Sequence, residues 1–171
     1  MRNSVYILLL LTCCCQPRET QQVNYQKIKD PLIDANINSI HIESDQIDAY
    51  VKRRKWPVLK TGTGLRYYVY KQNLPGEQAK NGKVASIAYE ITLLNGEVCY
   101  STKETGPKSF LIGMDDVESG LHEGIQYLRV GEKAKIIIPS HLAHGLAGDL
   151  KKIPQKSSIV YDVELLSLKT P

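Results

Sequence analysis

The stretch of sequence that decides the fold is KVASIAYEITLLNGEVCYST, residues 83–102. Residues 83–94 alternate in the way that is typical of a strand, because successive side chains of a strand point to opposite faces of the sheet. Asn95 and Gly96 then predict a hairpin turn, since both residues accept a positive φ, and residues 97–102 return as the partner strand. We therefore expect an antiparallel hairpin. One face of its first strand carries Ala85, Ile87, Tyr89 and Ile91, and the other carries Val84, Ser86, Ala88 and Glu90.

Around this hairpin the chain predicts further strands at residues 65–71, 133–139 and 158–168. The one convincing helix of this region follows Asp115 and Asp116, whose carboxylates can accept hydrogen bonds from the first N–H groups of a helix. Its apolar positions form a single stripe, which should face a sheet. The fold class we expect is α+β, with an antiparallel half-barrel sheet of about five strands wrapped on one short helix. The stripe consists of Val117, Leu121, Ile125 and Leu128.

A long connection separates the last two predicted strands. It runs over residues 139–157, is irregular throughout, and contains Gly145, Gly148 and Pro154. So long an irregular loop in a compact domain is usually functional.

The start of the chain is typical of a bacterial lipoprotein signal, which we place at residues 1–12. Positive charge at Arg2 precedes the apolar run 5–11, which is too short to span a bilayer permanently. Leucine three residues before Cys13, and a small residue directly before it, resemble a lipobox, so Cys13 is the preferred lipidation site, with Cys14 and Cys15 as alternatives. A multiply acylated cysteine would attach the chain stably to a membrane.

Residues 13–42 are rich in Gln, Asn, Lys and Asp and lack a sustained apolar period, which favours a flexible tether. Residues 43–60 predict a short helical extension, with Ser44 or Asp45 as its N-cap and Trp56-Pro57 at its end. The main domain is then residues 61–171.

Composition and residue spacing exclude several classes of function. A formal net charge of +4, mixed in sign along 171 residues, implies no nucleic-acid partner. Three of the four cysteines are contiguous and Cys99 lies far downstream, so the spacing indicates no set of structural disulfides. His141 and His144 lie three apart without a third ligand nearby, so we interpret them as loop or pocket histidines and expect neither a metal nor a cofactor.

The order of short motifs from Lys83 to Lys169 closely resembles the FK506-binding-protein family of peptidyl-prolyl isomerases. The motifs are AYEITLLNG at 88–96, FLIG at 110–113, GLHEG at 120–124, VGEKAK at 130–135, IP at 153–154 and VYDVELL at 160–166. The resemblance implies the half-wrapped sheet of that family and an apolar cleft that isomerises X–Pro bonds. Such a reaction moves no proton, so the lack of a nucleophile with its base agrees with it.

The resemblance also implies which residues line the cleft. The pocket tyrosine falls on Tyr89, and the backbone N–H that meets the substrate carbonyl falls at the end of Asp116-Val117-Glu118. Leu121 takes the place of the aromatic floor, and His144 that of the loop tyrosine. The full set expected to carry catalysis is Tyr89, Val117, Glu118, Leu121, His144, Ile153 and Tyr161, with Cys99, Tyr100, Phe110 and Asp116 binding the substrate.

Several of these residues have a simpler interpretation. Phe110, Leu121 and Ile153 could belong only to the core, and Tyr89 and Tyr161 could be interior aromatics whose hydroxyls find partners.

The motifs NGEVCYS at 95–101, DDVESGL at 115–121 and SHLAHG at 140–145 are similar to those of the gliding-motility-associated isomerase lipoproteins of Bacteroidetes. This implies a monomeric domain on a lipid anchor, facing the periplasm, that acts on Pro-containing segments of cell-envelope proteins. Since Cys99-Tyr100 and His144 depart from the usual family residues, a binding or chaperone module with little turnover is the alternative.

Overall fold

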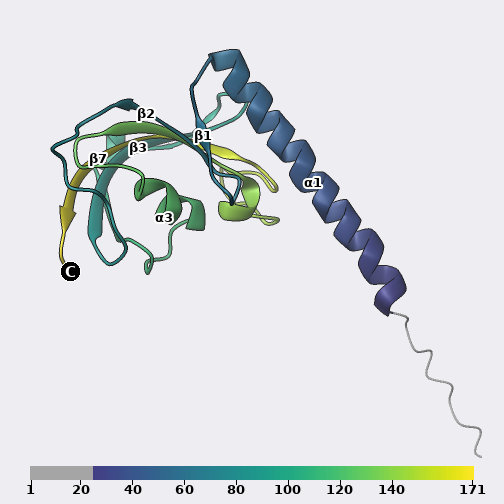
Figure 1. Cartoon of the computed structure of the whole chain (residues 1–171). Helices are drawn as coiled ribbons and strands as arrows, with labels where there is room; N and C mark the ends of the chain where they lie inside the picture. The colour runs from purple at the N-terminus through teal and green to yellow at the C-terminus, as the bar shows by residue number, and fades with distance from the viewer. Residues whose placement is uncertain (1–24) are drawn as a thin grey trace, which may run out of the picture. The chain divides into compact units, whose positions relative to one another are not determined.

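The computed structural model describes residues 25–171, and the chain divides into two units, Met1–Ala35 and Asn36–Pro171. The predicted signal peptide and the candidate lipidation sites Cys13, Cys14 and Cys15 lie outside the described residues. Among the helices that the structure describes, none combines the length and the apolar character needed to cross a membrane. The second unit contains the sheet (Figure 1).

The first helix is longer than the sequence predicted. Helix α1 covers Tyr25–Arg54, so residues 25–42 are helical where a flexible tether was expected, and Ser44 and Asp45 lie inside the helix and do not cap it. The prediction relied on the missing apolar stripe, but a helix whose surface is exposed on all sides needs none. The side chains of residues 36–42 are indeed exposed, and an apolar face starts at Ile47.

Seven antiparallel strands form one curved sheet, two more than the sequence predicted, because two very short strands escape a periodicity argument. The sheet order is β1-β2-β6-β7-β3-β4, and β5 pairs with β3 beside β4 (Figure 1). The strands are β1 Leu59–Lys60, β2 Arg66–Lys71, β3 Val84–Leu93, β4 Val98–Ser101, β5 Lys108–Leu111, β6 Lys133–Ile138 and β7 Ile159–Lys169.

The predicted central hairpin is present, and β3 and β4 pair across it. Gly96 has a φ of 95°, whereas Asn95 keeps a negative φ, so one residue with a positive φ suffices for this turn. After β4, the short helix α2 (Thr102–Thr105) interrupts the edge, and β5 then pairs with the first half of β3. At this gap the Thr102 hydroxyl replaces the backbone of a partner strand. It accepts a hydrogen bond from the Tyr89 N–H at 2.8 Å and donates one to the Tyr89 carbonyl at 3.1 Å.

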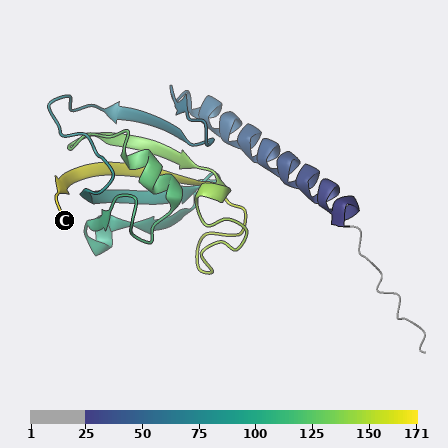
Figure 2. The same ribbon diagram turned by 60° about the horizontal axis from the view of Figure 1, so that its bottom comes forward.

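Helix α3, Ser119–Ile125, lies across one face of the sheet (Figure 2). Its N-cap position is Glu118, so Asp115 and Asp116 do not cap it, and an Asp115 oxygen instead accepts the Leu111 N–H at 2.7 Å. The helix approaches β6 closely because Gly120 faces it: a Cβ there would lie 2.2 Å from Ile138 Cγ2. The apolar stripe is buried as predicted at three of its four positions, Leu121, Ile125 and Leu128, although the last lies beyond the helix end.

The opposite face of the sheet carries a second, smaller core. Because neighbouring residues of a strand face opposite ways, Ile137 and Val160 point away from α3 and pack with Ile47, Tyr50 and Val51 of α1. Polar contacts join the same surfaces in two places. The Arg66 side chain, 1% exposed, donates to Asp48 and Ser44, and Glu43 accepts from Ser140 and Ser158.

Candidate active site

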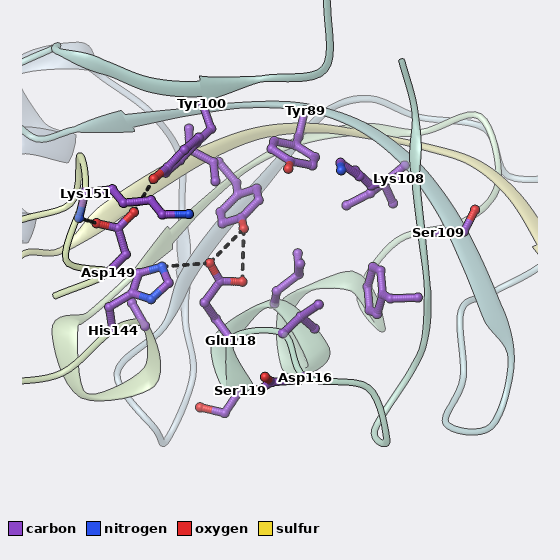
Figure 3. A pocket seen from close by; sticks show the side chains of 17 residues that line it. Tyr89, Tyr100, Lys108, Ser109, Asp116, Glu118, Ser119, His144, Asp149 and Lys151 are labelled. Carbon is purple, nitrogen blue, oxygen red and sulfur yellow. Dashed lines mark hydrogen bonds and ion pairs between the residues drawn. The ribbon is translucent and has the colours of Figure 1, made fainter. Parts of the chain in front are cut away.

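A cleft of about 640 Å³ opens between α3, the concave side of the sheet and the loop that follows β6 (Figure 3). Strand β3 supplies Tyr89, β4 supplies Tyr100, and β7 supplies Tyr161. The residues just before and within α3 form the opposite side, and His144 comes from the long loop. The cleft therefore gathers segments that are far apart in the sequence, and the long loop takes part as its length indicated.

The deep part of the cleft is aromatic and apolar. The rings of Tyr89 and Tyr161 lie 5.4 Å apart at an interplanar angle of 56°, a tilted geometry that favours aromatic contact. Phe110 and Leu121 are buried beside them and still line the cleft. This part of the site offers a dry surface on which a ring such as that of proline can pack.

A carboxylate lies within this apolar wall. The Tyr161 hydroxyl donates to both carboxylate oxygens of Glu118 at 3.1 Å, and His144 Nε2 lies 3.1 Å from Glu118 Oε1 (Figure 3). The Glu118 side chain is only 12% exposed, so these partners replace water around its charge. Burial, with a further contribution from the Glu118 charge, raises the pKa of Tyr161 well above its ordinary value and raises the pKa of Tyr89 as well.

A second set of hydrogen bonds, at the rim of the cleft, holds the long loop in place. The Tyr100 hydroxyl donates to Asp149, which also accepts the backbone N–H groups of Lys151 at 2.9 Å and Ile153 at 2.8 Å. Burial alone would raise the pKa of Asp149, but these hydrogen bonds outweigh it and lower the pKa to about 2. The same bond, together with burial, raises the pKa of Tyr100 to about 12. Asp149 is therefore ionised at neutral pH and holds the loop against β4.

His122 supports the segment that leads into the site. Its Nδ1 accepts the Gly113 N–H at 2.8 Å, and its Nε2 lies 2.9 Å from the Asp115 carbonyl oxygen, to which it can donate. The two contacts connect α3 to the turn that precedes Asp116.

The structure brings nine of the eleven predicted residues to the lining of the cleft. The other two, Cys99 and Ile153, lie in the core and do not line it. Cys99 was expected to bind the substrate, but its side chain is buried, with Sγ 3.6 Å from the Lys152 carbonyl, and burial raises the pKa of the thiol. The nine are Tyr89, Tyr100, Phe110, Asp116, Val117, Glu118, Leu121, His144 and Tyr161.

Sequence reasoning missed eight lining residues. Ile87 and Ile91 share a strand face with Tyr89, so the period of two could have placed them in the cleft. No sequence signal pointed to Asp149 or Lys151, because their positions depend on how the long loop folds back. The remaining four are Lys108, Ser109, Ser119 and Ala143.

Within the described part of the chain, no group of three or more His, Cys, Asp or Glu side chains is arranged to hold a metal ion. The two loop histidines have separate partners, since His141 Nε2 lies 3.1 Å from the Thr63 carbonyl oxygen and His144 pairs with Glu118.

Comparisons with known proteins agree on one family. Residues 76–166 match the profile of the FKBP-type peptidyl-prolyl cis-trans isomerases. FK506-binding protein 2 of Dictyostelium discoideum is 40% identical over 92 residues, which are 53% of this chain and 69% of that protein. The FKBP-type peptidyl-prolyl cis-trans isomerase FkpA of Buchnera aphidicola subsp. Schizaphis graminum is 35% identical over 114 residues, which are 66% of this chain but only 44% of that relative.

Among solved structures, the crystal structure of FkpA from Escherichia coli is similar, with a TM-score of 0.66 and 30% sequence identity. The match covers 87% of this chain and 75% of that one.

Proposed function

Because this chain belongs to the FKBP-type peptidyl-prolyl cis-trans isomerase family, we propose that its cleft isomerises X–Pro peptide bonds in proteins of the cell envelope. The observation that carries this proposal is the aromatic and apolar cleft next to a free backbone donor. Glu118 lines the cleft, and its N–H has no hydrogen-bond partner among the described residues. The family resemblance assigns that N–H to the substrate carbonyl.

The reaction needs little more than this. Rotation about an X–Pro bond meets a barrier of about 18–20 kcal/mol that arises from amide resonance, and no covalent bond is broken. A twisted amide loses charge separation, so a site that removes water from the carbonyl stabilises the transition state relative to the planar ground state. Tyr89, Tyr161, Phe110 and Leu121 provide such a surface around the prolyl ring.

Membrane attachment is the second part of the proposal. The lipobox-like sequence ending at Cys13 supports a diacyl anchor, with Cys14 and Cys15 as alternatives. The motifs shared with gliding-motility-associated lipoproteins support a role in maturing envelope proteins on the periplasmic side.

A binding or chaperone module is the alternative, and a specific observation favours it. The Glu118–His144 pair and the Tyr100–Asp149 pair bring charge and hydrogen bonds into a cleft whose catalysis depends on dryness. Such a cleft could hold a Pro-containing segment without accelerating its rotation.

An isomerisation assay on the full chain in detergent micelles tests the proposal. NMR exchange spectroscopy on Leu-Pro and Phe-Pro peptides should show faster cis–trans exchange than the spontaneous rate, which has a time constant of tens to hundreds of seconds. An unaccelerated rate, together with binding of unfolded protein, would establish the alternative.

A pair of variants locates the activity. Leu121→Asp places a charge on the buried floor and should abolish turnover, whereas Leu166→Asp places the same charge on an exposed part of β7 and should retain it. Turnover that persists in a folded Leu121→Asp protein would show that the catalytic cleft lies elsewhere.

The anchor is tested separately. Mass spectrometry of the mature chain identifies the acylated cysteine, and Cys13→Ser should release the protein from the membrane fraction. A Cys13→Ser protein that stays acylated would assign the anchor to one of the two neighbouring cysteines.

A further inference from the structure

The feature that separates this cleft from a purely apolar one is a fixed carboxylate on its wall. Tyr161 and His144 both contact Glu118 and hold its carboxylate in place. Tyr161 is itself only 2% exposed. A charge in so dry a position interacts more strongly with a ligand than an exposed charge does, because less water screens it. Glu118 is therefore a charge of the cleft that little water screens.

Other charges line the cleft, but they differ in how firmly they are held. Asp149 is fixed by three hydrogen bonds and is ionised at neutral pH. Lys108, Lys151 and Asp116 also line the cleft, and Figure 3 shows the amino groups of both lysines turned toward it. These three residues are exposed, and no ion pair with a described side chain holds either lysine in place. The charges that hydrogen bonds hold in place are therefore those of Glu118 and Asp149, and both are negative.

Glu118 also has unused hydrogen-bonding capacity. A carboxylate offers about four acceptor positions. Oε1 receives Tyr161 and His144, whereas Oε2 receives only the shared Tyr161 hydroxyl. A ligand ammonium or guanidinium group that reaches Oε2 would find an acceptor position there that neither partner occupies.

We propose, on the premise that the cleft binds X–Pro bonds as described above, that Glu118 selects substrates with Lys or Arg before the proline and disfavours those with Asp or Glu. The choice of the residue before the proline rests on a second premise, namely which substrate carbonyl the Glu118 N–H receives. If the Glu118 N–H receives the carbonyl of that residue, its side chain starts only a few atoms from the Glu118 carboxylate. Charge complementarity at this contact favours a basic side chain and rejects an acidic one.

Two matched peptide pairs test the selection at low ionic strength. One pair has Lys or norleucine before the proline, and the other has Glu or Gln, so that each pair changes charge at nearly constant size. We expect kcat/KM from NMR exchange to be about tenfold higher for Lys-Pro than for Glu-Pro, and the ratio to fall as salt screens the contact. Equal values for Lys-Pro and Glu-Pro would overturn the inference.

Variants assign the effect to one residue. Glu118→Gln removes the charge and keeps an acceptor, so the Lys-to-Glu ratio should approach one. Glu77→Gln removes a charge outside the cleft, where Glu77 pairs with Lys83 at 3.3 Å, and should keep the ratio of the unmodified protein. A ratio that Glu118→Gln leaves unchanged would assign the selection to another carboxylate and overturn the proposal.

Binding measurements separate this inference from the proposed activity. Titration calorimetry with the same four peptides reports the charge preference even where exchange is not accelerated. Tighter binding of Lys-Pro without faster exchange would refute the isomerase and retain the role of Glu118. Accelerated Leu-Pro exchange with equal affinities for Lys-Pro and Glu-Pro peptides would retain the isomerase and refute the role of Glu118.

Discussion

Removing the Tyr161 hydroxyl should destabilise the fold because it leaves Glu118 in a dry position without its main donor. The hydroxyl donates to both Glu118 oxygens at 3.1 Å, and the carboxylate side chain is 12% exposed. A hydrogen bond to a charged group contributes about 1.5–3 kcal/mol, so Tyr161→Phe should lower the free energy of unfolding by that amount. Glu118→Leu leaves the buried Tyr161 hydroxyl without an acceptor and should cost about 1–3 kcal/mol.

The double variant should be less destabilised than either single one. Replacing both partners of a buried polar contact by apolar groups of similar shape is nearly neutral, so Tyr161→Phe with Glu118→Leu should cost only about 0–1 kcal/mol. The two substitutions are then coupled by roughly 2 kcal/mol or more. His144 contributes little to this difference, because its side chain is 29% exposed and water can replace Glu118.

Urea unfolding measures the cycle. The fluorescence of Trp56, the single tryptophan of the chain, reports the core on the other face of the sheet. With an m-value of about 1–3 kcal/mol/M, a loss of 2 kcal/mol should move the midpoint by roughly 1 M. Additive losses, with the double variant as unstable as the sum of the two single ones, would refute the claim that Tyr161 and Glu118 form one buried contact.

Two further predictions concern packing and pH. Gly120→Ala should cost about 1–3 kcal/mol, because its Cβ would lie 2.2 Å from Ile138 Cγ2, whereas Gly62→Ala meets no atom within 4 Å and should be nearly neutral in the same urea titration. Tyr100→Phe should lower stability at neutral pH by removing the donor to Asp149, whose pKa is 3.8 ordinarily and about 2 when folded. A depressed pKa stabilises the fold above the ordinary value, so the stability difference between parent and variant should be full above about pH 4 and shrink as the pH falls through about 2. A difference that stays constant over this range would show that Asp149 does not receive this bond.

The sequence predicted those parts of the fold whose signals lie in residues close together along the chain. The alternation of residues 83–94 placed Ile87, Tyr89 and Ile91 on one face, and the structure confirms a common face that lines the cleft. The turn at Asn95-Gly96 and the burial of three of the four stripe positions, Leu121, Ile125 and Leu128, are confirmed for the same reason. The short strands and the long α1 helix were missed, because neither produces an apolar period that a sequence pattern can reveal.

The sequence by itself determined the longer strands, the helix that packs on the sheet, their apolar faces and the family, since each of these depends on residues that are neighbours along the chain. Only the tertiary structure decided which side chains meet. The Glu118 carboxylate joins Tyr161, 43 residues away, and His144 in the long loop, and this pairing depends on the position of β7 and on how the loop folds back. Cys99 is buried and Asp149 reaches the rim for the same physical reason. Long-range contacts are set by strand register and loop closure, which no local periodicity records.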